Sequence, residues 1–391
     1  MVDFVLPLPL GPALSRDLGF AAPAVAWLSV SYTVASLLAG LGASLVVDRL
    51  GKRTVIVGGL ACFVLANAAT AVVDHLAGLL LCRALAALAG APVVATLMSE
   101  VIDQTPADQR GRSISVVMSG ASIAVILGVP MALGVSEVMG WRAAFSIIAA
   151  LSAMLLSIAW RADFDVEKLE ADKVSAAREG TARTALSQLM ILPTVQRAML
   201  LQALSQFATF LIIPVLATYL VINLRISSSI IPLVYSSGGL VAFACMRFSG
   251  GMSDRMGYRT PFLTACAALM LAMTMFGWGV SADQPLMAVF AFILFMAANA
   301  AKNVALASHT AGAPPPGLRA SFMNVQCSMQ DAAILVGSLG PLALLSQSSQ
   351  DAAIEGMPTL MVVALVAMLA LIVVDAFRPG SDAAQDQDKP A

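Results

Sequence analysis

Charged residues are scarce in this chain. Asp, Glu, Lys and Arg together make up 12% of its 391 residues, whereas soluble domains carry about 25%. The mean hydropathy is +0.87, and 59% of the residues are hydrophobic. So little charge excludes a soluble domain and predicts an integral membrane protein, with the lipid bilayer around it and no nucleic-acid partner.

Residues that carry catalytic or metal chemistry are also few. The two histidines, His75 and His309, are far apart and lack ligand spacing. The five cysteines all fall in predicted membrane spans, where they serve as small packing residues. Gly51-Lys52 is the one Gly-Lys pair, and a phosphate-binding loop would need glycine where Val46 stands. We therefore expect no enzyme, no metal site and no cofactor.

Long apolar runs are what the chain has instead. Crossing about 30 Å of hydrocarbon takes about 20 residues of helix, and unbroken runs favour helices over a barrel. The stretch VDFVLPLPLGPAL at residues 2–14 is too short to cross alone and contains Asp3 and three prolines. We interpret it as a first span whose cytoplasmic half is missing, rather than as a signal peptide. Eleven complete spans are predicted near residues 24–47, 54–73, 77–101, 113–136, 144–160, 198–221, 228–248, 260–280, 285–308, 321–346 and 357–377.

The distribution of Lys and Arg indicates the orientation. Arg16, Arg142 and Arg225 are the basic residues of the predicted outer loops, and Arg83 and Lys302 lie inside spans. All the others fall in predicted inner loops, helix ends or the tail, as the positive-inside rule requires. We predict a multi-pass protein of the bacterial inner (plasma) membrane with a cytoplasmic C-terminus.

One charged turn occurs twice. LVVDRLGKRT at residues 45–54 returns as MSDRMGYRT at 252–260, each time between the second and third spans of a six-span half. Transporters built by such duplication hold their substrate between the halves, near the middle of the membrane. The repeat predicts a first bundle at 1–160, a cytoplasmic linker at 161–197, a second bundle at 198–377 and a cytoplasmic tail at 378–391.

The doubled turn resembles the signature Gly-x-Leu-Ala/Ser-Asp-Arg-x-Gly-Arg-Arg of the major facilitator superfamily, in particular its twelve-span drug or sugar efflux branch, whose members exchange substrate for protons. Ser44 replaces the first glycine, and Tyr258 replaces one basic residue. The resemblance implies an all-α membrane protein with two pseudo-symmetric six-helix bundles. Four further stretches are similar to family landmarks: Arg110-Gly111-Arg112, Gly128-Val129-Pro130, Gly140-Trp141-Arg142 and Ala320-Ser321-Phe322-Met323.

The residues of the turn have separate predicted roles in gating. Gly51 and Gly257 allow the positive φ of a tight connection. By resemblance, Asp48 faces the start of the eleventh span, and by duplication Asp254 faces the start of the fifth span, near Arg112. Free N–H groups and the helix dipole at these starts favour a carboxylate by about 0.5–2 kcal/mol, which would hold the inner gate shut. Four basic residues keep the turns on the cytoplasmic side: Arg49, Arg53, Arg255 and Arg259. Ordinary topology-setting loops are the alternative interpretation.

Ionisable groups inside spans are costly and therefore functional candidates. Asp3 lies in the middle of the first span if that helix begins upstream, and the resemblance implies an acidic residue there. Arg83 matches the arginine of a family motif Arg-x-x-Gln-Gly, although Ala86 and Ala87 stand in place of Gln and Gly. An Asp3–Arg83 pair is a candidate proton-coupling site, and a static buried ion pair is the alternative.

Lys302 and Asp331 are a second candidate pair. Their depths in the tenth and eleventh spans differ by about 6 Å at helical rise, which a long side chain can bridge. Such a pair would fix structure, balance a charged substrate or carry the proton.

Other polar and small residues follow helical spacing. Lipid cannot satisfy polar side chains, so six of them either line a substrate cavity or form interior hydrogen bonds: Gln202, Gln206, Asn299, Asn303, Gln326 and Gln330. In the second span, a seam of small residues predicts close helix packing: Ser36, Gly40 and Ser44. In the fifth span, Gly128, Pro130 and Gly134 resemble the family's antiporter motif, which bends the helix, admits a neighbouring helix and favours efflux.

These features predict a secondary active transporter that acts as a monomer. We expect it to export a small organic molecule in exchange for protons, by alternating access between its two halves. Two alternatives stay open: proton-coupled import, and a transport-inactive binding or scaffold protein with the same fold.

Overall fold

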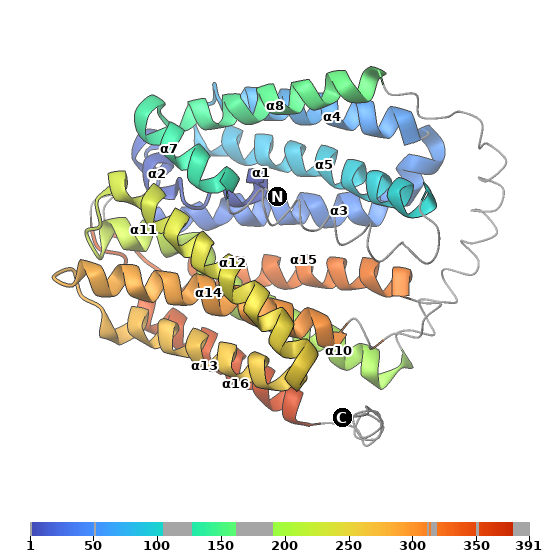
Figure 1. The fold of residues 1–391 in the computed structure, drawn as a ribbon. Helices are drawn as coiled ribbons and strands as arrows, with labels where there is room; N and C mark the ends of the chain where they lie inside the picture. Colours follow the sequence, from blue (N-terminus) through green and yellow to red (C-terminus); the bar gives the residue numbers. More distant parts are fainter. Residues whose placement is uncertain are drawn as a thin grey trace.

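The computed structural model describes residues 2–50, 52–104, 127–161, 191–310, 313, 319–348 and 352–377. Regular structure over these residues is helical, apart from one antiparallel bridge between Ser346 and Glu355. The helices lie in two groups, which Figure 1 shows one above the other: the first helix group in blue to blue-green, the second in light green through yellow to red.

The first helix group begins with a broken span. α1 (Val2–Val5) and α2 (Gly11–Leu18) are separated by a turn that contains Pro7 and Pro9, because proline lacks the N–H that a continuous helix needs. The short helix η1 (Ala22–Val25) leads into the second span. The remaining helices are α3 (Ala26–Leu50), α4 (Lys52–Thr70), α5 (Leu76–Gln104), α7 (Val129–Met139) and α8 (Trp141–Arg161).

The second helix group begins with another broken span. α10 (Pro193–Phe210) and α11 (Ile213–Ile222) are interrupted next to Pro214, for the same reason. α13 (Arg259–Thr274) continues as a π-helical turn, η5 (Met275–Gly279). The remaining elements are η4 (Ser228–Ile230), α12 (Ile231–Met256), α14 (Pro285–Thr310), α15 (Arg319–Leu344) and α16 (Met357–Ala376).

The predicted spans are largely confirmed. Within the described residues, 10 helices are long and apolar enough to cross a membrane, and they match the predicted spans other than the first and the fifth. The seventh span begins at Pro193 rather than at residue 198, since proline fits the first turn of a helix, where its N–H would have no partner. Of the predicted fifth span, only the part from residue 127 onward lies within the described residues.

Helices pair in the same way in both groups. α3 packs on α5, and the corresponding α12 packs on α14. Likewise α4 packs on α5 and α8, and α13 packs on α14 and α16. The repeated pairing is what the duplicated turn predicts.

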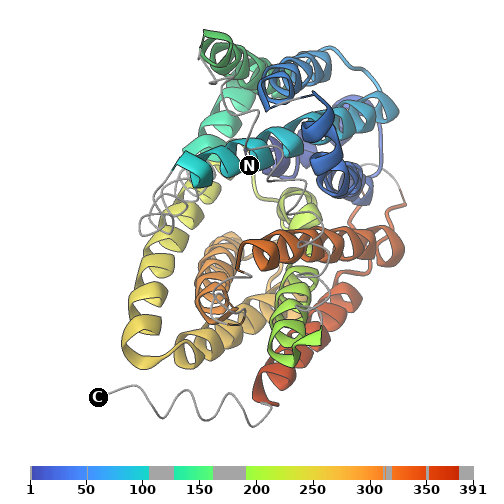
Figure 2. The same cartoon turned by 90° about the vertical axis from the view of Figure 1, so that its right-hand side faces the viewer.

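Among the described helices, three pairs account for most of the contacts between the two groups. α3 lies against α15, α7 against α12, and α2 against α11. Figure 2 looks at the molecule from the right-hand side of Figure 1, with the first helix group above the second. The first two pairs are equivalent by the duplication, because they join the second span of one half to the fifth span of the other.

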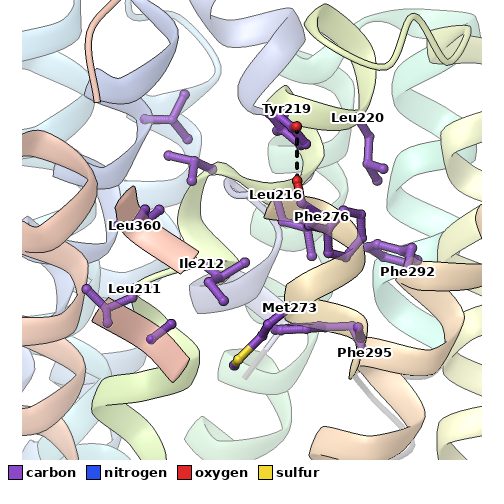
Figure 3. Close-up of a cluster of buried hydrophobic side chains, with 14 of the residues drawn as sticks. Leu211, Ile212, Leu216, Tyr219, Leu220, Met273, Phe276, Phe292, Phe295 and Leu360 are labelled. Atoms are coloured by element: carbon purple, nitrogen blue, oxygen red, sulfur yellow. Dashed lines mark hydrogen bonds between the residues drawn. The ribbon is translucent and has the colours of Figure 1, made fainter. Parts of the chain in front are cut away.

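One apolar core connects the groups. It includes Leu6 and Leu10 of the first group and Leu216 and Leu220 of the second. Figure 3 shows its part in the second helix group, where the Tyr219 hydroxyl donates a hydrogen bond to the Phe276 carbonyl in η5 at 3.2 Å. That bond satisfies both polar groups inside the core.

The outer surface of the helices is apolar as well. Large apolar side chains on several helices are exposed in the isolated chain, among them Leu38, Leu65, Leu240, Phe248 and Leu286. In water such a surface would drive aggregation, whereas lipid tails solvate it. The helices therefore present a lipid-facing surface.

Candidate functional site

A buried ion pair lies inside the first helix group. The guanidinium of Arg83, on α5, contacts the carboxylate of Asp3, on α1, at 2.5 Å. Arg83 is 0% exposed and Asp3 is 4% exposed. The predicted pair is therefore present, and it joins the first span to the fourth.

Two polar side chains and one ring complete the surroundings of Arg83. Its Nη2 atom donates to Asn67 Oδ1 at 3.1 Å and to Thr70 Oγ1 at 2.7 Å. Both residues lie on α4, and the Phe145 ring of α8 lies 4.8 Å from the guanidinium carbon. The second carboxylate oxygen of Asp3, Oδ2, is buried without a hydrogen-bond partner.

Lys302 and Asp331 do not pair, contrary to one of the alternatives from the sequence. Lys302 Nζ donates to the Ser205 carbonyl at 3.2 Å and to Thr209 Oγ1 at 3.1 Å. Asp331 instead accepts a hydrogen bond from Ser36 at 3.3 Å. The predicted depths were compatible, but α10 packs against both α14 and α15, so the lysine meets α10 before it can reach the aspartate.

The polar stripes of the second helix group mostly bond to one another. Gln202 donates to Thr310 Oγ1 and accepts from Gln330, each at 3.3 Å. Asn299 accepts from Thr209 and Asn303 accepts from Ser205, each at 3.4 Å. These four side chains thus form interior hydrogen bonds, and Gln330, Asn299 and Asn303 remain half-buried, so their predicted place in a substrate cavity stays a prediction. The two remaining glutamines differ: Gln206 is half-buried, and Gln326 has a buried Oε1 without a partner.

Three aromatic rings meet where the two groups join. The Phe4 ring lies 5.1 Å from the Tyr32 ring and 6.0 Å from the Phe210 ring, between centroids. Phe4 and Tyr32 belong to the first helix group and Phe210 to the second. Sequence reasoning missed this cluster because each ring is a single aromatic residue on a separate span, with no spacing that marks it.

Ser36 also has a role that the sequence did not predict. The small-residue seam was expected to serve packing alone, and α3 does pack on α15. The Ser36 hydroxyl in addition crosses between the groups to reach Asp331. The side chain of Ser44 lies outside the described residues.

The predicted contacts of Asp48 and Asp254 with helix starts of the opposite group, here called the inner clamp, lie largely outside the described residues. The side chains of Asp48, Arg49 and Asp254 lie outside the described residues, as do Gly51 and Arg112. The clamp therefore stays a prediction.

The described parts of the two turns show what their other residues do. Gly257 has φ +79°, which confirms its predicted role in the turn. Arg53 donates to the Trp160 carbonyl at 3.3 Å, and Arg259 lies 3.8 Å from the Asp375 carboxylate. Each arginine thus meets the C-terminal end of the last helix of its own group, where the helix dipole favours a cation. Arg255 is exposed.

Only part of the predicted antiporter motif lets a neighbouring helix come close to the fifth span. A Cβ atom at Gly128 would lie 2.7 Å from Val2 of α1, so this glycine lets the first span come near. Pro130 lies in the first turn of α7. A Cβ atom at Gly134 would have open space around it, so Gly134 admits no neighbour.

The two groups also contact each other at the end of the molecule opposite the charged turns. Gln347, in the connection between α15 and α16, accepts a hydrogen bond from the Ala22 backbone N–H at 2.7 Å. A Cβ atom at Gly11 of α2 would lie 2.7 Å from Thr218 Oγ1 of α11. The two groups are therefore in contact at this end of the molecule.

Comparison with known sequences places the chain among transporters. The profile of the Major Facilitator Superfamily matches residues 1–338. A chloramphenicol resistance protein of Streptomyces lividans is 28% identical over 282 residues, which cover 71% of this chain and 68% of that protein. A probable sugar efflux transporter of Pasteurella multocida is 30% identical over 107 residues, covering 27% of this chain and 26% of that protein.

Solved structures share the fold at low sequence identity. A bacterial homolog of the human lysosomal transporter Spinster, in an inward-facing and unoccupied conformation, has a TM-score of 0.72 at 15% identity, covering 95% of this chain and 92% of that chain. A D-xylose-proton symporter has a TM-score of 0.71 at 14% identity, covering 96% and 94%.

Proposed function

The chain belongs to the major facilitator superfamily, and we propose that this multi-pass membrane transporter exports a small organic molecule in exchange for protons. The proposal places it in the bacterial inner membrane as a monomer, with a cytoplasmic C-terminus. Its bundles are residues 1–160 and 198–377, joined by a cytoplasmic linker at 161–197 and followed by a tail at 378–391. They would rock about a central site.

The Asp3–Arg83 pair is the observation that carries the proton coupling. Asp3 offers a buried carboxylate oxygen without a partner. A proton bound there would remove the negative charge that balances Arg83. An uncompensated buried cation costs several kcal/mol, so protonation favours a rearrangement that gives Arg83 water or another partner. The proton thus acts on the same helices that must move.

The contacts between the groups at the outer end support the alternating-access part of the proposal. The Ala22–Gln347 hydrogen bond is one of the contacts between the groups at this end. Hydrogen bonds of this kind contribute about 0.5–1.5 kcal/mol each, and differences of a few kcal/mol leave a second conformation populated. Such an end can open during the cycle.

Export rather than import is favoured by two observations. Two of the relatives are named for chloramphenicol resistance and sugar efflux. The close approach of the first span at Gly128 fits a motif that the family uses in antiporters. The likeness to a proton symporter concerns the fold alone.

Purified protein in liposomes that contain a pH-sensitive dye tests the proposal, with an imposed pH gradient of each sign and chloramphenicol as the first probe. We expect substrate and protons to move in opposite directions. Movement in the same direction would establish symport, and proton flux that ignores chloramphenicol and a panel of amphiphilic drugs would rule out the proposed coupling.

Variants locate the coupling group. Asp3→Asn should abolish gradient-driven transport and leave substrate binding measurable. Asp74→Asn is the matched control, since the Asp74 side chain is 84% exposed on an outer loop and pairs with Arg142. Gradient-driven transport that survives in Asp3→Asn would remove Asp3 from the mechanism.

A further inference from the structure

We propose that a subsite for an organic cation with an aromatic or apolar body lies where the two helix groups join. Its carboxylate is Asp331, supported by Ser36, and its apolar wall is formed by the rings of Phe4, Tyr32 and Phe210. This inference rests on the proposed transport function and adds the chemical class of the substrate.

The charge of Asp331 distinguishes it from the other buried aspartates. Asp3 is balanced by Arg83, and Asp375 lies within 3.6 Å of Arg197. In the part of the chain that the structure describes, Asp331 forms no ion pair. Lys302, the cation nearest to it in depth, is bound to α10.

Position makes this carboxylate available to a ligand. Asp331 is half-buried in the interior of α15, and its hydrogen-bond partner is the neutral hydroxyl of Ser36. An ionisable group at such a depth is costly and tends to face a cavity or a partner. A ligand cation would supply the missing positive charge.

The rings lie within the length of one small ligand from this charge. Tyr32 and Ser36 are four residues apart on α3, so they share a face and are separated by about 6 Å along the helix. Phe210 lies beside the helix that carries the carboxylate, since a Cβ atom at Gly337 of α15 would be 3.2 Å from the Phe210 Cβ. Phe4 and Phe210 are half-buried like Tyr32, so the cluster is not sealed.

Aromatic faces attract cations and apolar bodies alike. A cation near a ring face gains about 0.5–2 kcal/mol, and the ring also removes apolar surface from water. An ammonium or phosphonium group near Asp331 with an aromatic body on the rings uses both parts of the subsite. A neutral molecule would leave the carboxylate unbalanced.

Both helix groups contribute to the subsite, so it is assembled only where they meet. Phe4, Tyr32 and Ser36 come from the first group, and Phe210 and Asp331 from the second. A cation bound here would bridge α3 and α15 and would favour the conformation in which these helices touch. Asp3 precedes Phe4 in the chain, but its charge is already balanced by Arg83.

Equilibrium binding of tetraphenylphosphonium to the full-length protein in lipid nanodiscs tests the inference, with neutral triphenylphosphine oxide as the matched probe. We expect tetraphenylphosphonium to bind more tightly than the neutral probe. Asp331→Asn should weaken its binding by about tenfold or more, because charge-assisted contacts are the strong ones. Asp331→Glu keeps the charge and should retain most of the affinity, and Tyr32→Leu should weaken binding of both probes.

Folding is checked separately by thermal unfolding, with Asp74→Asn as the charge-neutralising control away from the subsite. Unchanged tetraphenylphosphonium binding in a folded Asp331→Asn protein would overturn the inference, as would equal binding of the two probes by the unmodified protein. If no cation binds but chloramphenicol still drives proton exchange, the cation subsite is wrong and the proposed function stands. If cation binding depends on Asp331 but no substrate moves protons, the cation subsite stands and the proposed function is wrong.

Discussion

Gln347 of the second helix group accepts a hydrogen bond from the Ala22 backbone N–H at the start of the second span, at 2.7 Å. The free N–H groups at a helix start need acceptors from elsewhere, and here the acceptor comes from the opposite group. The side chain is held in place, because Gln347 Nε2 donates to the Ala352 carbonyl at 2.8 Å. One amide thus caps a helix start across the boundary between the two groups.

Replacement of Gln347 by Ala should favour opening at this end. Loss of one such bond costs about 1 kcal/mol, enough to shift a two-state equilibrium several-fold. Spin labels at Asp74 and Asp283, two exposed positions at the end opposite the charged turns, would report a larger population of long distances. An unchanged distance distribution would show that Gln347 does not contribute to the closure.

Arg83→Met should strongly destabilise the protein, and Asp3→Asn should partly rescue it. The single change leaves a buried carboxylate without its cation, which costs about 3–5 kcal/mol, whereas the double variant contains no buried charge at this place. Thermal unfolding in detergent measures both. The rescued protein should still fail to couple transport to a pH gradient. Equal stability of the single and double variants would mean that the pair is not electrostatically important.

Lys302→Met and Asp331→Asn should have independent effects. Lys302 binds α10 and Asp331 binds Ser36, so the two share no partner, and effects of such residues usually add within about 0.5 kcal/mol. A double-mutant cycle on tetraphenylphosphonium binding measures their coupling. A coupling energy well above that value would indicate that the two residues form an ion pair in another conformation.

Gly337→Ala should destabilise the contact between α15 and α10. A Cβ atom at Gly337 would lie 2.8 Å from the Phe207 carbonyl oxygen and 3.2 Å from the Phe210 Cβ, so a helix would have to shift. Gly134→Ala is the matched control, since its Cβ would meet no atom within 4 Å, and alanine there should raise stability by about 0.5–1 kcal/mol. Thermal unfolding distinguishes the two, and equal shifts would contradict the close packing at Gly337.

The inner clamp is tested at the turns themselves. Asp48→Asn and Asp254→Asn should each favour opening of the cytoplasmic side several-fold, since each predicted contact contributes about 0.5–2 kcal/mol. The helices that the contacts need are adjacent, because α3 packs on α15 and α12 on α7. Distances between spin labels at the cytoplasmic ends of these helices provide the measurement. If the variants leave both distances unchanged, the two turns only set the membrane topology and do not hold the gate.

The sequence by itself determined the class of fold, most of the spans and the duplication. The hydrocarbon of the bilayer restricts a spanning chain to few structures, because unpaired backbone groups are too costly there. The thickness of the bilayer also sets the helix length. The Asp3–Arg83 pair was also predictable, because these two are charged groups of opposite sign placed away from the ends of their spans in the first half. The turn at Gly257 followed from local backbone sterics.

Tertiary structure alone decided which side chains meet between helices. Depth can be counted along a span, but the rotation of each helix and the order of its neighbours are set by packing. For this reason α10 separates Lys302 from Asp331, although their depths agree. For the same reason Phe4, Tyr32 and Phe210 form a cluster that no spacing in the sequence announces.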